Sequence, residues 1–422
     1  MRNKIILAIL ILSIIALVFS GCDGGGSVTP PIIAPTPIPE IDETYPDLQE
    51  WLFGDAQNVT LTAKWNIQGT VWDGLLWDSR HTGIDYGAPE GTPVYSATEG
   101  TVKRVEHGKD CDEPECLSTV AIYNKATDVT FIYLHMKDIK VKKDHWVKAG
   151  DQIAAVGSQG PGGIHLHFEA RDGEQLWASF DVRDTIPPYE AAKEAREVTC
   201  PEEEVTLDSF RVAFEDIEWA NWSGGDCQGN NDYDYEDCVC DVDVDGKFIC
   251  GDHLKEVKFT ITYLNDGSGN LDHEFGLKMP SIFAGESCTY NLNGSISSSV
   301  PCPGEFIFFH KDIATPGEVF YLTITFESPF VYSYSGFVQT DIHGNLIDIK
   351  PFINIYWDSD NSFKEKLLAG TGDKRVLLVP EGWQWPSSDR TPLWDVYAEV
   401  IENDCYPEFT NPGTWTWTEG TP

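Results

Sequence analysis

Basic residues are scarce in this sequence. Its 422 residues include 29 lysines and arginines against 68 aspartates and glutamates, a formal net charge of −39 at pH 7. A chain this acidic repels phosphate, which argues against nucleic acid as a partner. The imbalance is weaker over residues 75–185, which carry 18 acidic and 12 basic side chains, so most of the acidity lies later. A solvated, soluble surface would account for that acidity. The more specific alternative is that these acidic side chains bind cations.

Long apolar runs are also scarce. The run at residues 5–19 is shorter than the roughly 20 residues that span a bilayer as a helix. Arg2 and Lys4 precede it, and a serine and a glycine separate it from Cys22. Residues 1–22 therefore resemble the signal peptide of an exported bacterial lipoprotein, with an uncleaved anchor helix as the alternative. The resemblance implies a lipid anchor on Cys22 and a location at the periplasmic face of a membrane, the inner membrane if Asp23 acts as a retention signal.

The cysteine count agrees with export. Ten of the eleven cysteines remain when Cys22 is set aside, an even number suited to disulfides in an oxidising compartment. Cys111 and Cys116 bracket a short acidic loop, and we expect them to pair with each other. The pairing of the other eight stays open; they are Cys200, Cys227, Cys238, Cys240, Cys250, Cys288, Cys302 and Cys405.

Helical periodicity and internal repeats are scarce as well, which favours a mainly β protein. Residues 23–48 are rich in glycine and proline and read as a tether. Residues 49–198 alternate short strand-like runs with turns and end in a helical candidate at 188–198. Residues 199–422 are acidic, contain most of the cysteines and show further alternating strands, which predicts a β-sandwich-like accessory region of unknown function.

The chain has only ten histidines, yet two of them stand one residue apart in the stretch "GGIHLHFEAR". On a strand, alternate side chains share a face, so His165 and His167 project together. Upstream, His81 and Asp85 are four residues apart, with Gly83 between them to allow a close approach. Imidazole and carboxylate groups are suitable zinc ligands, and a catalytic zinc needs three of them and an open position. His81, Asp85 and one histidine of the pair would make that set.

Five motifs carry a resemblance to a known family. In chain order they are "HTGID" at 81–85, "GTPVYSATEGTV" at 91–102, "YLHM" at 133–136, "VKKDHWVKAGDQIAAVG" at 141–157 and "HLHFE" at 165–169. Over about residues 75–175 the chain resembles the lysostaphin-like (LytM-type) zinc endopeptidases of bacterial cell walls.

The resemblance implies both a fold and roles for five residues. The fold would be a small antiparallel β-sheet domain (a duplicated hybrid motif, similar to the barrel-sandwich hybrids) with the site in a groove bordered by loops. His81, Asp85 and His167 would bind zinc, while His135 and His165 would be the catalytic histidines that do not ligate it. The division of labour between these two histidines stays open.

The expected reaction is hydrolysis of a peptide bond in the stem or cross-bridge peptides of peptidoglycan. Zinc would lower the pKa of a bound water, and an imidazole would take its proton. Two other functions remain open. The protein could be a non-catalytic peptidoglycan-binding or amidase-regulating lipoprotein, or the acidic region could be an adhesion module anchored by the peptidase-like domain.

A second metal site is predicted in the segment "DVDVDGKFICGD" at 241–252. Its spacing resembles the calcium loops of EF-hands and dockerins, where a glycine follows three oxygen ligands. The expected calcium ligands are Asp241, Asp243, Asp245 and Asp252, and an acidic surface hairpin is the alternative. Bound calcium would brace the accessory region.

Overall fold

The computed structural model describes residues 45–67, 80–108, 118–158, 163–179, 181–215, 238–265, 271–310, 314–334, 337–338, 345–346, 349–357, 362–369, 371, 376–380, 400–403 and 406–409. The predictions on Cys22, on most of the tether and on the Cys111–Cys116 pair lie outside them. Within them, no helix has the length and apolar character needed to cross a membrane. Residues 45–422 form a compact unit that is separate from residues 1–44.

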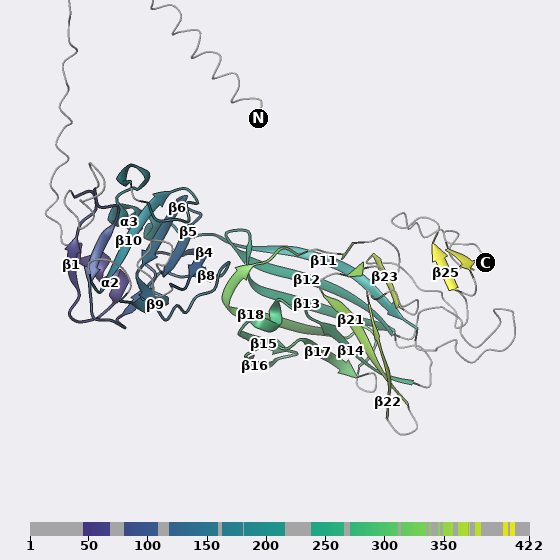
Figure 1. Cartoon of the computed structure of the whole chain (residues 1–422). Coiled ribbons are helices and arrows are strands. Elements are labelled where there is room, and N and C mark those ends of the chain that lie inside the picture. The colour runs from purple at the N-terminus through teal and green to yellow at the C-terminus, as the bar shows by residue number, and fades with distance from the viewer. Residues whose placement is uncertain are drawn as a thin grey trace, which may run out of the picture. The chain divides into compact units, whose positions relative to one another are not determined.

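The first part of this unit is built on a seven-stranded antiparallel sheet (Figure 1). In spatial order its strands are β1 (Thr60–Ala63), β2 (Ile84–Gly87), β10 (His165–Asp172), β6 (Val129–Leu134), β5 (Thr119–Asn124), β4 (Gly100–Glu106) and β8 (Trp146–Val147). A three-stranded sheet follows the order β3 (Pro93–Tyr95), β9 (Gln152–Val156) and β7 (Met136–Lys137). The described residues also form the helix α2 (Pro46–Phe53), the 3₁₀ turn η2 (Val182–Asp184) and the helix α3 (Pro188–Glu197). Helix α3 confirms the helix predicted at 188–198.

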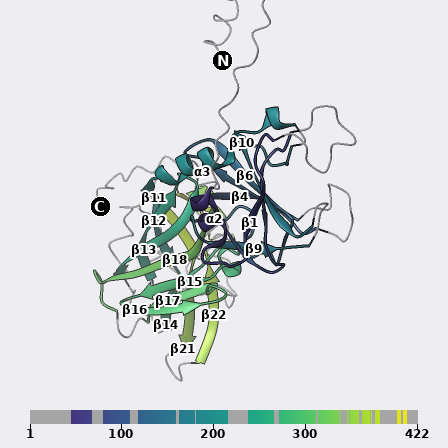
Figure 2. The same ribbon diagram turned by 90° about the vertical axis from the view of Figure 1, so that its left-hand side faces the viewer.

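The two faces of the larger sheet differ in character. On one face, alternate residues such as Phe131 and Phe168 join a core with Leu52 of α2 and Ala192 of α3. The other face carries a smaller apolar cluster of Ala121, Ile132 and Leu134 and leaves room for polar groups; the loop after β10 covers part of it. Figure 2 shows both helices beside this sheet. One face is therefore the structural core, and the opposite face is available for chemistry.

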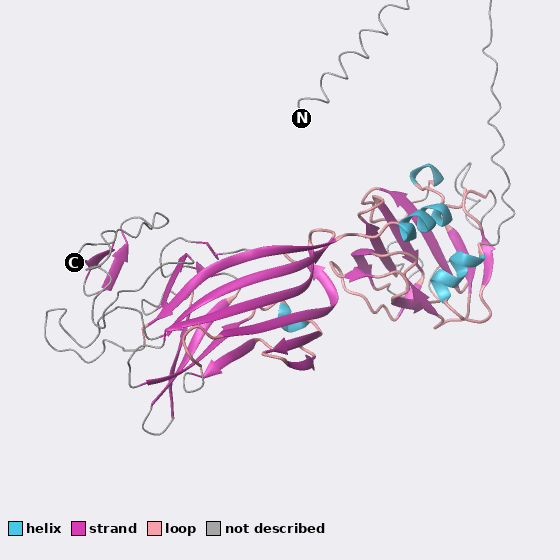
Figure 3. Ribbon diagram, turned by 180° about the vertical axis from the view of Figure 1, so that it is seen from behind, coloured by secondary structure: helices cyan, strands magenta, loops and turns pink. Residues whose placement is uncertain are grey.

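The second part contains two further antiparallel sheets (Figure 3). One follows the order β16 (Ser295–Ser299), β15 (Cys288–Leu292), β18 (Val319–Val331), β13 (His253–Asn265), β12 (Cys238–Ile249), β11 (Glu202–Phe214) and β23 (Val376–Pro380). The other follows the order β17 (Glu305–His310), β14 (Leu271–Lys278), β21 (Lys350–Trp357) and β22 (Ser362–Leu368). Smaller elements among its described residues are η3 (Phe283–Gly285) and two pairs of short strands, β19 (Phe337–Val338) with β20 (Asn345–Leu346) and β24 (Val400–Asn403) with β25 (Tyr406–Phe409).

These two sheets share one apolar core. Phe214 of the larger sheet meets Phe275 of the smaller one at a ring-centroid distance of 6.4 Å, and Phe320 meets Phe309 at 4.7 Å. Two sheets that bury their inner faces against each other form a sandwich. The mainly β, antiparallel fold class is confirmed. The domain boundary predicted at residues 198 and 199 falls between α3 and β11 and stays a prediction.

Among the described residues of the second part, four cysteines form two disulfides. Cys200 pairs with Cys250, and Cys288 pairs with Cys302 across the β15–β16 hairpin. Cys238 and Cys240 are buried thiols within the described part of the chain.

The predicted calcium loop is wrong. Asp241, Asp243 and Asp245 lie in the extended strand β12, where buried valines alternate with them. Extended residues rise about 3.3 Å each, so Asp241 and Asp245 are about 13 Å apart along the strand and do not converge on one ion.

The aspartates of this strand instead bind side chains of the neighbouring strand β11. Arg211 donates through Nε to Asp241 at 2.7 Å, Ser209 donates to Asp243 at 2.7 Å, and Thr206 donates to Asp245 at 3.0 Å. The fourth expected ligand, Asp252, lies in the turn after β12 and accepts a hydrogen bond from Nδ1 of the following residue, His253, at 2.8 Å. The four carboxylates therefore serve separate contacts.

Candidate functional site

Three of the predicted site residues form one cluster. Asp85 on β2 and His167 on β10 are directly paired across the two strands, and His81 lies just before β2. His167 Nδ1 is 2.8 Å from Asp85 Oδ1, and His81 Nε2 is 3.2 Å from Asp85 Oδ2. One ligand atom from each residue lies within 4.8 Å of the other two. Strand pairing thus brings together residues that are 82 positions apart in the chain.

Gly83 permits this close approach. A Cβ atom at this position would lie 2.5 Å from the backbone oxygen of Phe168 and 2.7 Å from the ring of His167. Both distances are shorter than a non-bonded contact allows, so any side chain here would push β10 away from the His81–Asp85 segment. Gly83 therefore allows the His81–Asp85 segment to lie close to β10, as the sequence predicts.

The three side chains of the cluster lie close enough together to hold one metal ion. Tetrahedral zinc with ligand bonds of about 2.0–2.1 Å separates its ligand atoms by about 3.3 Å. The shortest separations in the cluster, 2.8 Å from His167 Nδ1 to Asp85 Oδ1 and 3.2 Å from His81 Nε2 to Asp85 Oδ2, are made by different carboxylate oxygens, either of which could be the single ligand atom of Asp85. Two imidazole nitrogens and a carboxylate are also the ligand types that zinc accepts in catalytic sites. These three residues could therefore hold a zinc ion and leave a fourth position open.

The charges in the cluster favour a cation. Burial raises the pKa of the Asp85 carboxyl, but hydrogen bonds with His167 and His81 outweigh burial and hold that pKa well below its usual range. Burial lowers the pKa of the His167 imidazole, whereas hydrogen bonds with Asp85 and Glu169 raise it, and the resulting pKa is about 10. A positive charge is thus stabilised between the two carboxylates.

Each histidine of the cluster has a further contact that orients its ring. His81 donates through Nδ1 to the backbone oxygen of Lys64 at 3.0 Å, which leaves Nε2 facing the cluster. His167 Nε2 lies 3.5 Å from Glu169 Oε2, which leaves Nδ1 facing Asp85. Glu169 is fully buried, and its carboxylate also accepts a hydrogen bond from the backbone N–H of Ser179 at 3.0 Å. Such contacts fix the tautomer and orientation of metal-binding histidines.

Sequence reasoning did not assign Glu169 a role. The signal was present, because Glu169 stands two residues after His167 and strand alternation puts both on one face. An acidic residue in that position is a candidate second partner for a metal-binding histidine.

The two histidines predicted to act without ligating metal lie beside the cluster. The ring centroids of His135 and His165 are 4.4 Å apart, and the His135 centroid is 6.4 Å from that of His167. His165 interacts through Nδ1 with the backbone oxygen of Gly163 at 2.9 Å, and its Nε2 lies 3.9 Å from Asp85 Oδ2. The structure therefore brings all five predicted residues together.

His135 owes its position to the backbone at the end of β6. Its φ is 64°, in the left-handed region that non-glycine residues seldom adopt. The N–H of Gly157 donates to the His135 carbonyl at 2.8 Å and holds this conformation. Backbone strain of this kind is often kept at functional sites because it directs a side chain.

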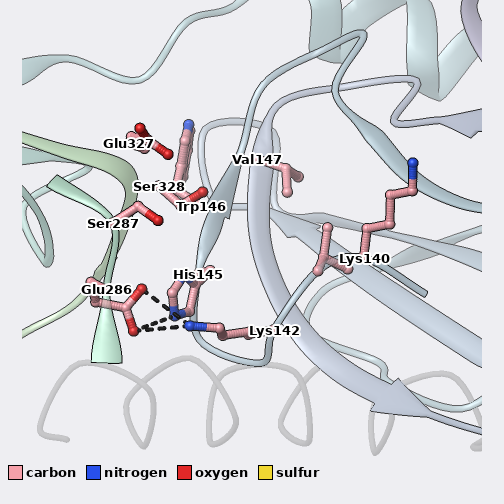
Figure 4. A pocket seen from close by; sticks show the side chains of 10 residues that line it. Lys140, Lys142, His145, Trp146, Val147, Glu286, Ser287, Glu327 and Ser328 are labelled. Atoms are coloured by element: carbon pink, nitrogen blue, oxygen red, sulfur yellow. Dashed lines mark hydrogen bonds and ion pairs between the residues drawn. The ribbon is translucent and has the colours of Figure 1, made fainter. Parts of the chain in front are cut away.

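A cavity lies elsewhere, on the far edge of the same sheet. Its lining includes Lys142 and His145, which precede β8, and Glu286 of the second part (Figure 4). Glu286 lies 3.3 Å from the Lys142 ammonium and 3.5 Å from His145 Nε2. None of the five site residues lines this cavity. This cavity is therefore separate from the candidate site.

Comparison with known proteins identifies the part of the chain that carries the cluster. Residues 79–178 match the model of Peptidase family M23. This segment is an M23 peptidase domain of the LytM type. The predicted resemblance to lysostaphin-like peptidoglycan endopeptidases is thereby confirmed.

Similar proteins share this M23 segment. The peptidoglycan DD-endopeptidase ShyA of Vibrio cholerae is 32% identical over 118 residues, which are 27% of this chain and 26% of ShyA. The DD-carboxypeptidase/endopeptidase Mpg of Neisseria gonorrhoeae is 36% identical over 94 residues, 22% of this chain and 20% of Mpg. The matches span about a quarter of these relatives. Among solved structures, the catalytic domain of lysostaphin from Staphylococcus simulans is 22% identical, with a TM-score of 0.26, over 32% of this chain and 93% of that one.

Proposed function

We propose that this protein is a zinc-dependent endopeptidase that hydrolyses peptide bonds in the stem or cross-bridge peptides of peptidoglycan. One observation carries the proposal: two imidazoles and a carboxylate converge at zinc-binding distances, with two further histidines beside them. The M23 match and the endopeptidase names of the relatives support it.

The mechanism assigns each residue a task. His81, Asp85 and His167 would hold the ion, and zinc bound there would act as a Lewis acid that lowers the pKa of a water to about 7. The Lys64 carbonyl and the Glu169 carboxylate keep the two imidazoles oriented.

His135 and His165 carry out the proton transfers. Imidazole exchanges protons near neutral pH, so one ring can accept the proton of the attacking water and pass it to the leaving amine. The other can donate a hydrogen bond to the substrate carbonyl oxygen as negative charge develops there. The contact between His165 Nδ1 and the Gly163 carbonyl directs Nε2 toward the cluster, where it can serve either task.

A digestion of purified sacculi tests this function. Wild type, His167→Ala and His165→Ala are incubated with sacculi, and the released fragments are identified by mass spectrometry. Because His107 is exposed and outside the cluster, His107→Ala is the matched control. We expect wild type and His107→Ala to release peptide-cleaved fragments, and the masses to give the bond that is cut. His167→Ala should lose zinc and activity, whereas His165→Ala should lose activity and keep zinc.

The main alternative is a peptidoglycan-binding or amidase-regulating protein without activity of its own. Zinc-loaded wild type that binds sacculi, or raises the activity of an added amidase, without cutting any peptide bond would favour that function and refute the endopeptidase.

We further propose that the protein is exported and anchored to the cell envelope through a lipid on Cys22. The support is the sequence of residues 1–22. Mass spectrometry of the protein extracted from membranes should find Cys22 as the N-terminal residue and carrying a lipid, and an unmodified Cys22 would refute the anchor.

A further inference from the structure

Trp177 stands out on the face of the sheet that carries the metal cluster. Its side chain is 61% exposed, which is more than any other aromatic side chain in the described ranges. It belongs to the loop that follows β10, the strand of His167. Single exposed apolar residues are common, so exposure alone assigns no role.

The backbone of this loop is fixed on both sides of Trp177. Arg104 donates to the Leu176 carbonyl at 3.0 Å, and Arg171 donates to the carbonyl of Trp177 itself. Two residues later, the N–H of Ser179 binds the buried carboxylate of Glu169. The loop is thus tied to the residue that orients His167. An exposed ring on an immobilised backbone loses little freedom when a ligand binds.

One face of the indole is covered and the rest of the ring remains accessible. The guanidinium carbon of Arg104 lies 3.4 Å from the ring centroid, a stacked cation–π contact. Arg104 is itself paired with Glu106 two residues along β4. The result is a flat aromatic surface with a rigid backing and a charged border.

Strand register places this surface relative to the metal cluster. Glu169, Ile132, Ala121 and Arg104 are successive direct partners across β10, β6, β5 and β4. Neighbouring strands are about 4.8 Å apart, so the backbone of Arg104 lies about 14 Å from that of Glu169. Side chains of directly paired residues lie on the same face of a sheet, so Arg104 and Glu169 share a face. The indole that Arg104 covers therefore lies on the same side of the sheet as His167.

We infer that Trp177, backed by Arg104, is a saccharide-binding platform that stacks on a sugar ring of the glycan strand whose peptide is cut at the metal cluster. The inference rests on the proposed endopeptidase function. A pyranose ring has a flat face of C–H groups, which packs on the open face of the indole, and a rim of hydroxyls, which can hydrogen-bond to solvent-accessible polar groups beside it such as the Glu106 carboxylate. The backbone separation of Arg104 and Glu169, about 14 Å, corresponds to about four residues of extended chain. A short stem peptide can therefore connect a sugar on the platform to a peptide bond at the cluster.

The test compares two substrates that differ only in their sugars. One is a cross-linked muropeptide dimer with its disaccharides, and the other is the same cross-linked peptide without them. For Trp177→Ala we expect kcat/KM to fall roughly threefold to tenfold on the sugar-bearing substrate, the size of one aromatic stacking contact, mainly through KM. It should stay unchanged on the bare peptide. Equal losses on both substrates, or no loss on either, would overturn the platform.

Two further variants serve as controls. Trp177→Leu keeps apolar bulk against Arg104 without a flat ring and should behave as Trp177→Ala does. Phe363→Ala removes another exposed aromatic, on β22, and should leave both substrates unaffected. The zinc content and melting temperature of each variant establish that its metal cluster and fold are intact.

A binding measurement separates this inference from the proposed function. Calorimetry with zinc-loaded His165→Ala protein measures the affinity for the disaccharide–peptide released from sacculi by a muramidase, with and without Trp177→Ala. A Kd weakened roughly threefold to tenfold by Trp177→Ala supports the platform even if wild type cuts neither substrate. An unchanged Kd, or no binding, overturns the platform even if wild type is an active endopeptidase.

Discussion

Glu169→Gln should weaken zinc binding while it leaves the fold intact. Two contacts of the carboxylate matter here: it accepts from the N–H of Ser179 at 3.0 Å, and its other oxygen lies 3.5 Å from His167 Nε2. Arg171 Nε lies 3.9 Å from the oxygen that Ser179 binds. Glutamine has the same shape but only one oxygen. If that oxygen remains with Ser179, the amide NH₂ faces His167 and favours the tautomer that carries its proton on Nδ1. Nδ1 is the atom that faces Asp85, and a protonated nitrogen does not bind zinc.

The expected loss of zinc affinity can be estimated from what such contacts to metal-binding histidines contribute elsewhere. Loss of the group that orients a metal-binding histidine typically weakens metal affinity 10- to 100-fold. This range corresponds to about 1.4–2.7 kcal/mol at 25 °C. The loss of zinc affinity in Glu169→Gln should lie within this range. Glu169 is fully buried, so water cannot replace its carboxylate as a partner for His167.

Competition with a chromophoric zinc chelator measures this affinity directly and does not depend on turnover. Glu174→Gln is the matched control, because Glu174 lies just after β10, is exposed and pairs with Lys103 at 3.5 Å. We expect wild-type affinity for Glu174→Gln. A Glu169→Gln protein with wild-type melting temperature and a zinc affinity within twofold of wild type would refute the assigned role of Glu169.

Three further predictions concern the close approach of the strands, the pH dependence of stability and a disulfide. Gly83→Ala should lower stability by about 1–3 kcal/mol, because its Cβ overlaps the Phe168 carbonyl, and should abolish zinc uptake; wild-type zinc content would contradict this. His253 is buried, and burial lowers its pKa, so the unfolded chain takes up the proton first as pH falls below about 6.5. Urea unfolding should therefore show wild type losing more stability than His253→Gln between pH 7.5 and 5.5, and equal losses would exclude His253 as the cause. Replacing both Cys288 and Cys302 by serine should cost about 2–4 kcal/mol, measured by chemical unfolding, while cleavage of soluble muropeptides stays at the wild-type rate.

The candidate cluster could be anticipated because each of its motifs is short and local. His81 and Asp85 are four residues apart, and His165 and His167 lie on one face of a strand whatever the strand pairs with. What the sequence does not contain is the pairing of β2 with β10, which sets the 2.8 Å contact between Asp85 and His167. The order of motifs known from a family supplied that long-range information.

The contacts around the cluster were harder to anticipate for the same reason. Trp177 is ten residues from His167 in the chain, and its place on the sheet depends on three loop contacts and on the register of β4, β5 and β6. No local pattern encodes that combination.

The incorrect calcium prediction shows how one spacing can fit two structures. Aspartates at alternate positions followed by a glycine match a calcium loop, yet the residues between them, Val242 and Val244, are both fully buried. Alternation of apolar and polar residues is the pattern of a strand with one buried face, and a loop that wraps an ion has no need of it. The deciding signal was therefore the period of two in the apolar residues. At His165–His167 the same period places two side chains on the face of the sheet that carries the cluster. At Asp241–Asp245 it places three carboxylates on a face where Arg211 and two hydroxyl groups already bind them.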